Sequence, residues 1–240
     1  MGLLFLENLM NFRKIIYFTS IIALLFNYSL LGQESLEFIK DPITDSLVLI
    51  SYEEITISGF TTQMSVYYGA GTIIEMGKPH PENDDLILAK ILTAKHVVAD
   101  NVKVESHLGS KDLNGKVLKK HEIYDIALVE AYVSNKCKAI EIGKYKKNNA
   151  EVKLMGYPLS IDASKHKVWK SKKKRSTKNF TLLDSDVSPG ASGGAVIEDD
   201  KVVGVISRGC ATWFQEEGQP KFTWPTVTIG VGPIKELLKE

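Results

Sequence analysis

The sequence predicts an all-β fold of two successive barrels with a short helix at the C-terminal end. From residue 46 onward, short runs rich in Val, Ile, Leu and Tyr are separated by Gly, Pro, Asn and Asp, as in strands joined by turns. Many short strands with regular turns are typical of a sandwich or of barrels. A polar stretch, residues 134–149, divides the runs into two halves of about a hundred residues each, a size that suits two small barrels.

This pattern predicts ten strands and one helix. Five strands are expected in the first half, about residues 45–133, and five in the second half, about residues 150–240. The helix is expected over residues 233–239, where apolar side chains recur at helical spacing and would pack against the second barrel. The predicted strands cover residues 46–52, 63–76, 86–98, 102–108, 126–133, 151–156, 180–183, 194–197, 202–206 and 222–231.

Residues 1–32 have the layout of a secretory signal peptide. Arg13 and Lys14 precede an uncharged, mostly apolar run over residues 15–31, and the small residue Gly32 offers a cleavage point. The alternative is an uncleaved membrane anchor, because the apolar run approaches the length that crosses a bilayer. We expect cleavage, because the stretch after the run is polar, and export to the periplasm or the medium.

The start of the chain carries one irregularity. Glu7 ahead of the basic pair is unusual for a signal peptide, so Met10 is an alternative start of translation. The exported domain would then cover residues 33–240 in either case. Without residues 1–32 it holds 28 basic and 28 acidic residues, a balance that gives no general affinity for nucleic acid.

Two cysteines, Cys137 and Cys210, allow at most one intramolecular disulfide bond. An exported protein with so few cysteines must obtain its stability from its core, unlike disulfide-dense secreted domains. The hydrophobic content of 44% is ample for such a core.

Three short motifs contain the candidate reactive residues. His96 lies in an apolar run, Asp125 stands at the start of an apolar strand, and Ser192 lies among small residues that leave room for a substrate backbone. Taken singly, each has an ordinary explanation: a core histidine, a strand-opening aspartate and a surface turn. The order His, Asp, Ser is one of three chain orders in which Ser-His-Asp triads for acyl transfer occur.

These motifs resemble those of the chymotrypsin-like, or trypsin-like, serine peptidases. The segment T-A-K-H that ends at His96 is similar to the family's T-A-x-H, D-I-A-L from Asp125 is identical to its D-I-A-L, and G-A-S-G-G around Ser192 is similar to its G-D-S-G-G. Weaker similarities begin at Tyr68 (Y-G-A-G-T-I-I), end at Pro158 (M-G-Y-P) and begin at Gly204 (G-V-I-S-R-G). The resemblance implies two six-stranded antiparallel barrels with the site between them, and it covers the chain from about residue 45.

The resemblance also implies roles for the site residues. Ser192 would be the nucleophile, His96 the general base and acid, and Asp125 the group that orients His96. The N–H groups of Gly190 and Ser192 would form the oxyanion hole, and the reaction would need no cofactor and no metal. Ala191 stands where the animal enzymes have the aspartate that pairs with a new N-terminus, so that activation route is not expected.

The best match is to the bacterial branch, the HtrA-like and glutamyl-endopeptidase-like enzymes, here without the PDZ domain that usually follows in HtrA-like proteins. Asp186, six positions before the nucleophile, would lie at the floor of the specificity pocket and favour Arg or Lys before the scissile bond. Ser207, Arg208 and Gly209 would line a pocket wall, and Arg208 could neutralise Asp186. HtrA-like enzymes prefer small aliphatic residues and often carry an aspartate at the position of Asp184, so both preferences stay open.

Two other functions compete with a serine endopeptidase. A catalytically silent pseudopeptidase would be a binding module on the same fold, although the three complete triad motifs argue against it. A hydrolase of non-peptide esters is a weaker alternative. Protein or peptide substrates are the expected partners, and nucleic acid is not expected.

A basic segment extends from Lys165 to Lys178 and contains eight Lys or Arg residues and no acidic residue. A run of like charges is usually a solvated face, and docking of an acidic partner is the alternative. Val168 and Trp169 within the segment favour one face of a strand or hairpin.

Overall fold

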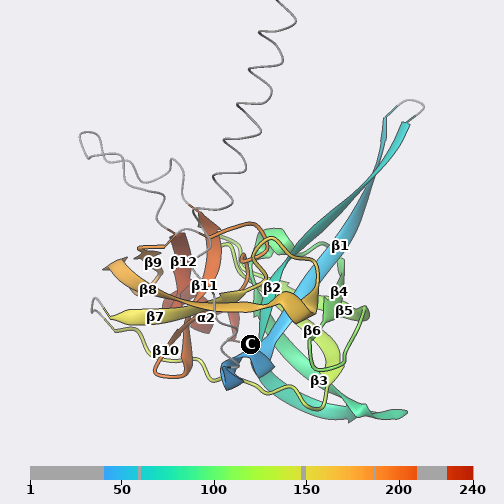
Figure 1. Ribbon diagram of the computed structural model, residues 1–240, viewed down its shortest axis with the longest axis horizontal. Coiled ribbons are helices and arrows are strands. Elements are labelled where there is room, and N and C mark those ends of the chain that lie inside the picture. Colours follow the sequence, from blue (N-terminus) through green and yellow to red (C-terminus); the bar gives the residue numbers. More distant parts are fainter. Residues whose placement is uncertain (1–40, 59–60, 147–149, 186, 210–225, 240) are drawn as a thin grey trace, which may run out of the picture. The chain divides into compact units, whose positions relative to one another are not determined.

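The computed structural model describes residues 41–239 apart from 59–60, 147–149, 186 and 210–225 (Figure 1). The predicted leader, residues 1–32, therefore lies outside the described residues, as do Asp186 and Cys210. Cys137 is a buried free thiol, and burial raises its pKa. In the described part of the chain, no helix combines the length and the hydrophobicity needed to span a membrane.

Two closed, six-stranded antiparallel barrels form the fold, as predicted (Figure 1). The order of paired strands is β1-β2-β3-β6-β5-β4 in the first barrel and β10-β11-β12-β9-β8-β7 in the second. A short helix, α2 (Val231–Leu237), follows the last strand. The strands are β1 (Leu47–Ser58), β2 (Thr61–His80), β3 (Asn83–Thr93), β4 (Asn101–Glu105), β5 (Leu113–Lys120), β6 (Ala127–Ser134), β7 (Glu151–Gly156), β8 (Lys167–Ser176), β9 (Phe180–Leu183), β10 (Ala195–Glu198), β11 (Lys201–Gly209) and β12 (Thr226–Gly230).

One apolar cluster joins the two barrels. Leu47, Leu49 and Ala70 of the first barrel pack in it with Met155 and Tyr157 of the second. Each fully buried large side chain contributes about 1.5–3 kcal/mol to stability, so this cluster holds the barrels against one another. The hydroxyl of Tyr157, which is fully buried, donates a hydrogen bond to the Leu47 carbonyl at 3.3 Å. Apolar packing and this hydrogen bond therefore both join the two barrels.

Several element predictions need correction. The prediction missed β5, in which a register shift interrupts the pairing between Val117 and Lys119. The strand or hairpin that Val168 and Trp169 favoured in the basic segment is confirmed as β8, although it was not among the ten strands predicted. The predicted strand 86–98 ends at Thr93, because residues 95–97 form a 3-10 turn. The helix α2 starts two residues before the predicted 233, since a proline is tolerated in a first helical turn.

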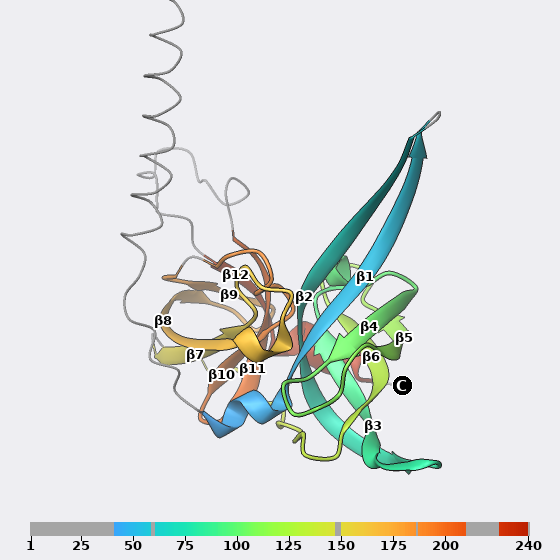
Figure 2. The same cartoon turned by 45° about the vertical axis from the view of Figure 1, so that its right-hand side comes forward.

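The first two strands extend far beyond their barrel. The sequence predicts strand ends at residues 52 and 63, whereas β1 and β2 stay paired as far as Ser58 and Thr61 in an unbroken register. The ribbon formed by residues 52–58 and 61–67, here called the β1–β2 arm, projects away from the first barrel in both views (Figures 1 and 2). Its alternating polar and apolar residues satisfy the strand pattern without a barrel to bury them.

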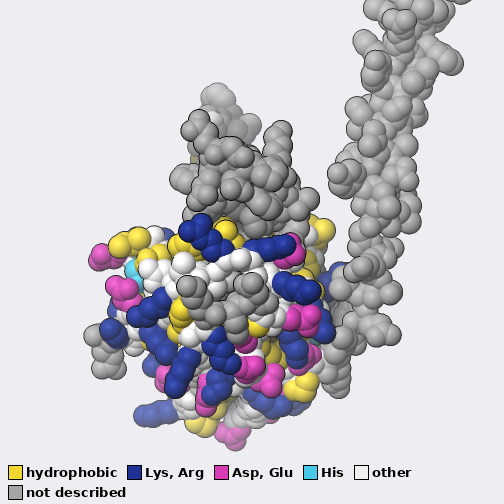
Figure 3. Space-filling view, turned by 90° about the vertical axis from the view of Figure 1, so that its left-hand side faces the viewer, with side chains coloured by type: hydrophobic (Ala, Val, Ile, Leu, Met, Phe, Trp, Pro, Cys, Tyr) yellow, Lys and Arg dark blue, Asp and Glu magenta, His cyan; other side chains and the backbone are white. Residues whose placement is uncertain are grey.

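Three of the eight Lys and Arg residues of the basic segment lie in ion pairs with acidic side chains. Lys170 lies 3.0 Å from Glu151, and Lys174 lies 2.9 Å from Asp184. Lys173 points inward, where its ammonium group lies 2.6 Å from the buried carboxylate of Glu198. Figure 3 shows the same interspersion of basic and acidic side chains on this side of the molecule. This pairing favours a solvated face over a docking site for an acidic partner.

Candidate active site

His96 and Asp125 are brought together by the pairing of β3 with β6. Thr93 at the end of β3 lies opposite Ala127 at the start of β6, so the residues just outside these ends are neighbours. The Asp125 carboxylate accepts two hydrogen bonds from His96: one from its backbone N–H at 3.0 Å and one from ring Nδ1 at 2.7 Å. The aspartate thus fixes both the backbone and the ring of the histidine.

The carboxylate of Asp125 is held in its ionised form. Burial acts to raise its pKa, but the hydrogen bonds from His96 and Ser207 outweigh burial and lower the pKa from 3.8 to about 2. An ionised carboxylate only accepts hydrogen bonds, so Nδ1 of His96 must carry the proton. In the neutral ring, this tautomer leaves a lone pair on the other nitrogen, Nε2, the form that a general base requires.

A second histidine braces the loop before Asp125. Nδ1 of His121 accepts hydrogen bonds from the N–H groups of Ile123 and Tyr124 at 3.2 and 3.3 Å. Lys95, next to His96, donates to the carbonyls of His121 and Glu122 at 2.9 and 3.2 Å. These hydrogen bonds hold residues 121–124, which precede Asp125, in a fixed position. The sequence motifs did not predict these contacts.

Ser192 lies in a tight turn between β9 and β10, and two glycines make this turn possible. Gly190 has φ +92° and Gly193 has φ +86°, in the left-handed region that side chains disfavour. A Cβ atom on Gly190 would lie 2.1 Å from the Tyr157 carbonyl oxygen, and one on Gly193 would lie 2.0 Å from the Ala70 carbonyl oxygen. The small residues around Ser192 are thus required by close backbone approaches.

The turn also fastens the two barrels to one another. The N–H of Ala70 in β2 donates to the Ser192 carbonyl at 2.7 Å, and the N–H of Gly193 donates to the Ile206 carbonyl in β11 at 2.7 Å. Thr93, the first residue of the T-A-K-H motif, donates from its hydroxyl to the Ala70 carbonyl at 2.6 Å. The motif thus supplies a structural residue as well as His96.

Ser207 connects the two halves of the site. Its hydroxyl donates to the Asp125 carboxylate at 2.5 Å, and its carbonyl accepts from the Ser192 hydroxyl at 3.2 Å. Ser207 of β11 therefore links Asp125, which holds His96, to Ser192. The sequence predicted Ser207 as a residue of the substrate pocket, and its contact with Asp125 had no sequence signal.

The predicted oxyanion donors have a suitable environment. Among the described residues, the N–H groups of Gly190 and Ser192 donate to no backbone carbonyl. The carbonyls of this turn are held instead, since the N–H of Tyr157 donates to the Gly190 carbonyl at 3.2 Å and that of Leu159 to the Pro189 carbonyl at 2.7 Å. Within the described residues, the predicted donors are therefore not engaged by backbone carbonyls, as an oxyanion hole requires.

The predicted specificity residues are placed only in part. Asp186 lies outside the described residues. Arg208 and Gly209 lie in β11 opposite Val227 and Thr226 of β12, and their side chains are not described. Asp184, the alternative marker, pairs with Lys174 at the surface.

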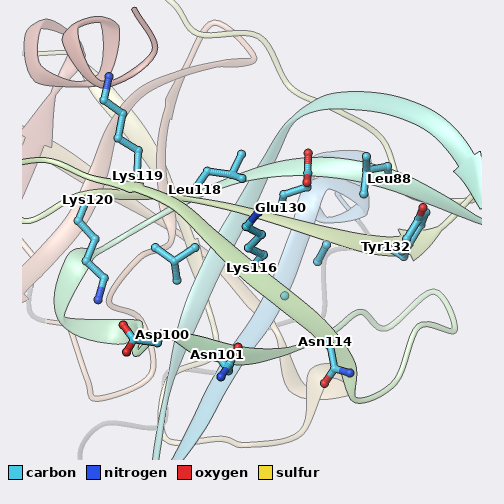
Figure 4. A pocket seen from close by; sticks show the side chains of 13 residues that line it. Leu88, Asp100, Asn101, Asn114, Lys116, Leu118, Lys119, Lys120, Glu130 and Tyr132 are labelled. Carbon is cyan, nitrogen blue, oxygen red and sulfur yellow. The ribbon is translucent and has the colours of Figure 1, made fainter. Parts of the chain in front are cut away.

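A surface hollow lies elsewhere, on the first barrel. It has a volume of about 810 Å³ and is lined mainly by β5 and neighbouring parts of the first barrel (Figure 4). Asn101, Lys116 and Glu130 are among its lining residues, and none of the predicted site residues is. No Ser, Cys, Thr or His lines this hollow, so the hydrogen-bonded group around Asp125 is the better candidate for an active site.

Comparison with known proteins agrees with this choice. The sequence profile of the family described as "Trypsin-like peptidase domain" matches residues 81–205, more than half of the chain. The match includes His96, Asp125 and Ser192. The chain has no significant match among curated proteins.

Proposed function

The chain belongs to the trypsin-like peptidase family, and from this premise we propose that it is a serine endopeptidase acting through a His96-Asp125-Ser192 triad. A peptidase domain implies protein or peptide substrates. The observation that carries the proposal is the linkage through Ser207, which contacts both the Asp125 carboxylate and the Ser192 hydroxyl. A core histidine, a strand-opening aspartate and a surface turn would not need to meet in this way.

The proposed reaction proceeds through an acyl-enzyme. The Ser192 hydroxyl turns from the Ser207 carbonyl toward His96, whose Nε2 takes its proton as the oxygen attacks the substrate carbonyl. Asp125 keeps the histidine in the correct tautomer and stabilises the imidazolium that forms. The N–H groups of Gly190 and Ser192 stabilise the oxyanion. His96 then gives the proton to the leaving amine, and water releases the acyl group by the same steps in reverse.

A fluorophosphonate probe tests this proposal on the exported domain. We expect labelling at Ser192, and we expect Ser192→Ala and His96→Ala each to lower kcat on casein on the order of 10⁴-fold or more, with the double variant little worse. No labelling of well-folded protein would support the binding module instead. Labelling with turnover of esters but not of casein would support a non-proteolytic hydrolase.

Within the family, we place the chain in the HtrA-like or glutamyl-endopeptidase-like branch, on the similarity of its serine segment. We propose cleavage after Arg or Lys, with Asp186 at the floor of the pocket, over cleavage after small aliphatic residues. The surface pairing of Asp184 with Lys174 leaves that aspartate little reason to enter a pocket. Cleavage-site profiling on a peptide library checks this, and an unchanged profile for Asp186→Ala would refute the assignment.

The layout of residues 1–32 supports export, with a mature chain that starts at Gln33. N-terminal sequencing of exported material tests this proposal. Protein that retains Met1 or Met10 in the membrane fraction would favour an anchor.

A further inference from the structure

The β1–β2 arm has two unlike faces. In the unbroken register of the hairpin, Ile55 lies opposite Met64, and Glu53 lies opposite Val66. Because side chains alternate across a strand, these residues share one face with Ile57. The other face carries Glu54, Thr56, Gln63 and Ser65, together with the stacked rings of Tyr52 and Tyr67.

The first face is apolar and uncovered. Ile55 is 64% exposed, Ile57 74%, Met64 62% and Val66 49%. Exposed apolar side chains that stand alone are common, but four neighbours on one side of a two-stranded ribbon form a contiguous patch. An isolated hairpin in water is marginally stable and gains nothing from such exposure. The fold therefore gives no structural reason for this patch.

The apolar face of the arm continues along β2 as far as the turn that contains Ser192. Tyr68 continues the same face of β2 beyond Val66, and its ring lies so close to Gly190 that a Cβ there would be 2.8 Å from Cε2. Two residues further on, Ala70 donates its hydrogen bond to the Ser192 carbonyl. At about 3.3 Å per residue, Met64 lies about 20 Å along the strand from that contact. A chain leaving the site thus reaches the patch within about six residues.

Strand edges are also open along the arm. Within the barrel, β1 pairs with β4 from Leu49 to Ser51, and β2 pairs with β3 from Gly71 onward. Neither pairing extends into the arm. Within the described residues, the outer edges of the arm therefore keep backbone N–H and C=O groups that can pair with an extended chain. An apolar face beside an open edge suits a polypeptide in strand conformation.

We propose that the apolar face of the arm, formed by Ile55, Ile57, Met64 and Val66, docks an extended, apolar segment of the polypeptide substrate. This inference rests on the proposed function. The arm carries Glu53 and Glu54 but no Lys or Arg, so it suits neutral or basic segments and disfavours acidic ones. The patch exposes on the order of a few hundred Å². A stable dimer buries about 1,200 Å² or more, so a second copy of the chain is a poorer occupant.

The test measures binding separately from cleavage. In the Ser192→Ala background, fluorescently labelled, reduced and carboxamidomethylated lysozyme serves as an unfolded, basic probe, and its succinylated form as an acidic one. The arm variant I55T/M64T replaces one cross-strand apolar pair with threonines, which are β-branched and suit a strand. Its matched control is Q63T/S65T on the opposite face. Circular dichroism verifies that each variant is folded.

We expect I55T/M64T to weaken binding of the basic probe by about tenfold, the effect of losing part of two buried apolar side chains. We expect Q63T/S65T to bind the basic probe with an affinity within about twofold of the Ser192→Ala parent. We expect the succinylated probe to bind more weakly than the basic probe to every variant. Equal binding by both variants would overturn the proposal. A dimer in sedimentation that I55T/M64T abolishes would also overturn the proposal, because the face would then bind a second copy of the chain. Binding to phosphatidylcholine vesicles that I55T/M64T abolishes would overturn it as well, because the face would then bind lipid.

Cleavage gives the second readout, with Ser192 intact. We expect I55T/M64T to lower kcat/KM for unfolded lysozyme, mainly through KM, and to leave hydrolysis of a tetrapeptide coumarin amide unchanged. An equal loss on both substrates would show damage to the site and would contradict docking. If the wild-type chain binds the probe through the arm but cleaves neither substrate, the proposed function fails and the docking surface stands.

Discussion

Asp125 should make the stability of this protein depend on pH in the acid range. Its pKa falls from an ordinary 3.8 to about 2 on folding, and a difference of about 1.8 corresponds to about 2.4 kcal/mol. The side chain is only 16% exposed, so solvent screening reduces this value little. Because the folded pKa is depressed, the stabilisation is present above pH 3.8 and is lost as pH falls through 2.

The perturbation is Asp125→Asn, which keeps the shape and removes the ionisation. We expect the free energy of unfolding of the wild type to fall between pH 5.5 and pH 2 by about 2 kcal/mol more than that of the variant. Urea titrations followed by tryptophan fluorescence measure both. Ser207→Ala should raise the Asp125 pKa, because it removes one of the three hydrogen bonds that lower it. The loss of stability then begins at higher pH.

The exposed Asp84 provides the control, since Asp84→Asn should follow the wild type across the whole range. If the free energy of unfolding varied with pH in parallel for the wild type and Asp125→Asn, the prediction would be refuted. This result would mean that the hydrogen bonds from His96 and Ser207 do not favour the ionised carboxylate in solution.

Two further predictions concern stability. Gly193→Ala should lower the free energy of unfolding by at least about 2 kcal/mol and abolish turnover, because Gly193 combines a left-handed φ with a blocked Cβ position. The control Gly109→Ala, at φ +113° in open space, should lower it less and leave activity intact. Equal losses of the two variants in denaturant titrations would contradict this prediction. Lys173→Met should lower the free energy of unfolding by about 3–5 kcal/mol, because it removes the ammonium group that lies 2.6 Å from the buried Glu198 carboxylate, and K173M/E198L should recover most of this loss. A loss below about 1 kcal/mol for the single variant would count against a stabilising buried pair.

The sequence predicted the barrels and the meeting of His96 with Asp125, because both depend on short motifs and local patterns. It could not predict the role of Ser207, whose hydroxyl contacts an aspartate that lies 82 residues away in the chain. It missed β5, where a register shift interrupts the pairing, and it indicated β8 only through Val168 and Trp169 within a run of basic residues. It ended β1 too early, because a ribbon with solvent on both faces has no buried face to reveal it. The specificity and export predictions concern residues outside the described part and stay predictions.

The hydrogen bonds that fasten the Ser192 turn to both barrels have a consequence for biosynthesis. A nascent chain that has folded only its first barrel can pair His96 with Asp125, yet it has no nucleophile and no Ser207. Ala70 then has no Ser192 carbonyl to bind, and the Ile206 carbonyl that holds Gly193 emerges later still. Under the proposed function, the chain cannot cut neighbouring polypeptides while it is being made. Proteolytic competence arrives as a late event of folding, when the second barrel closes against the first.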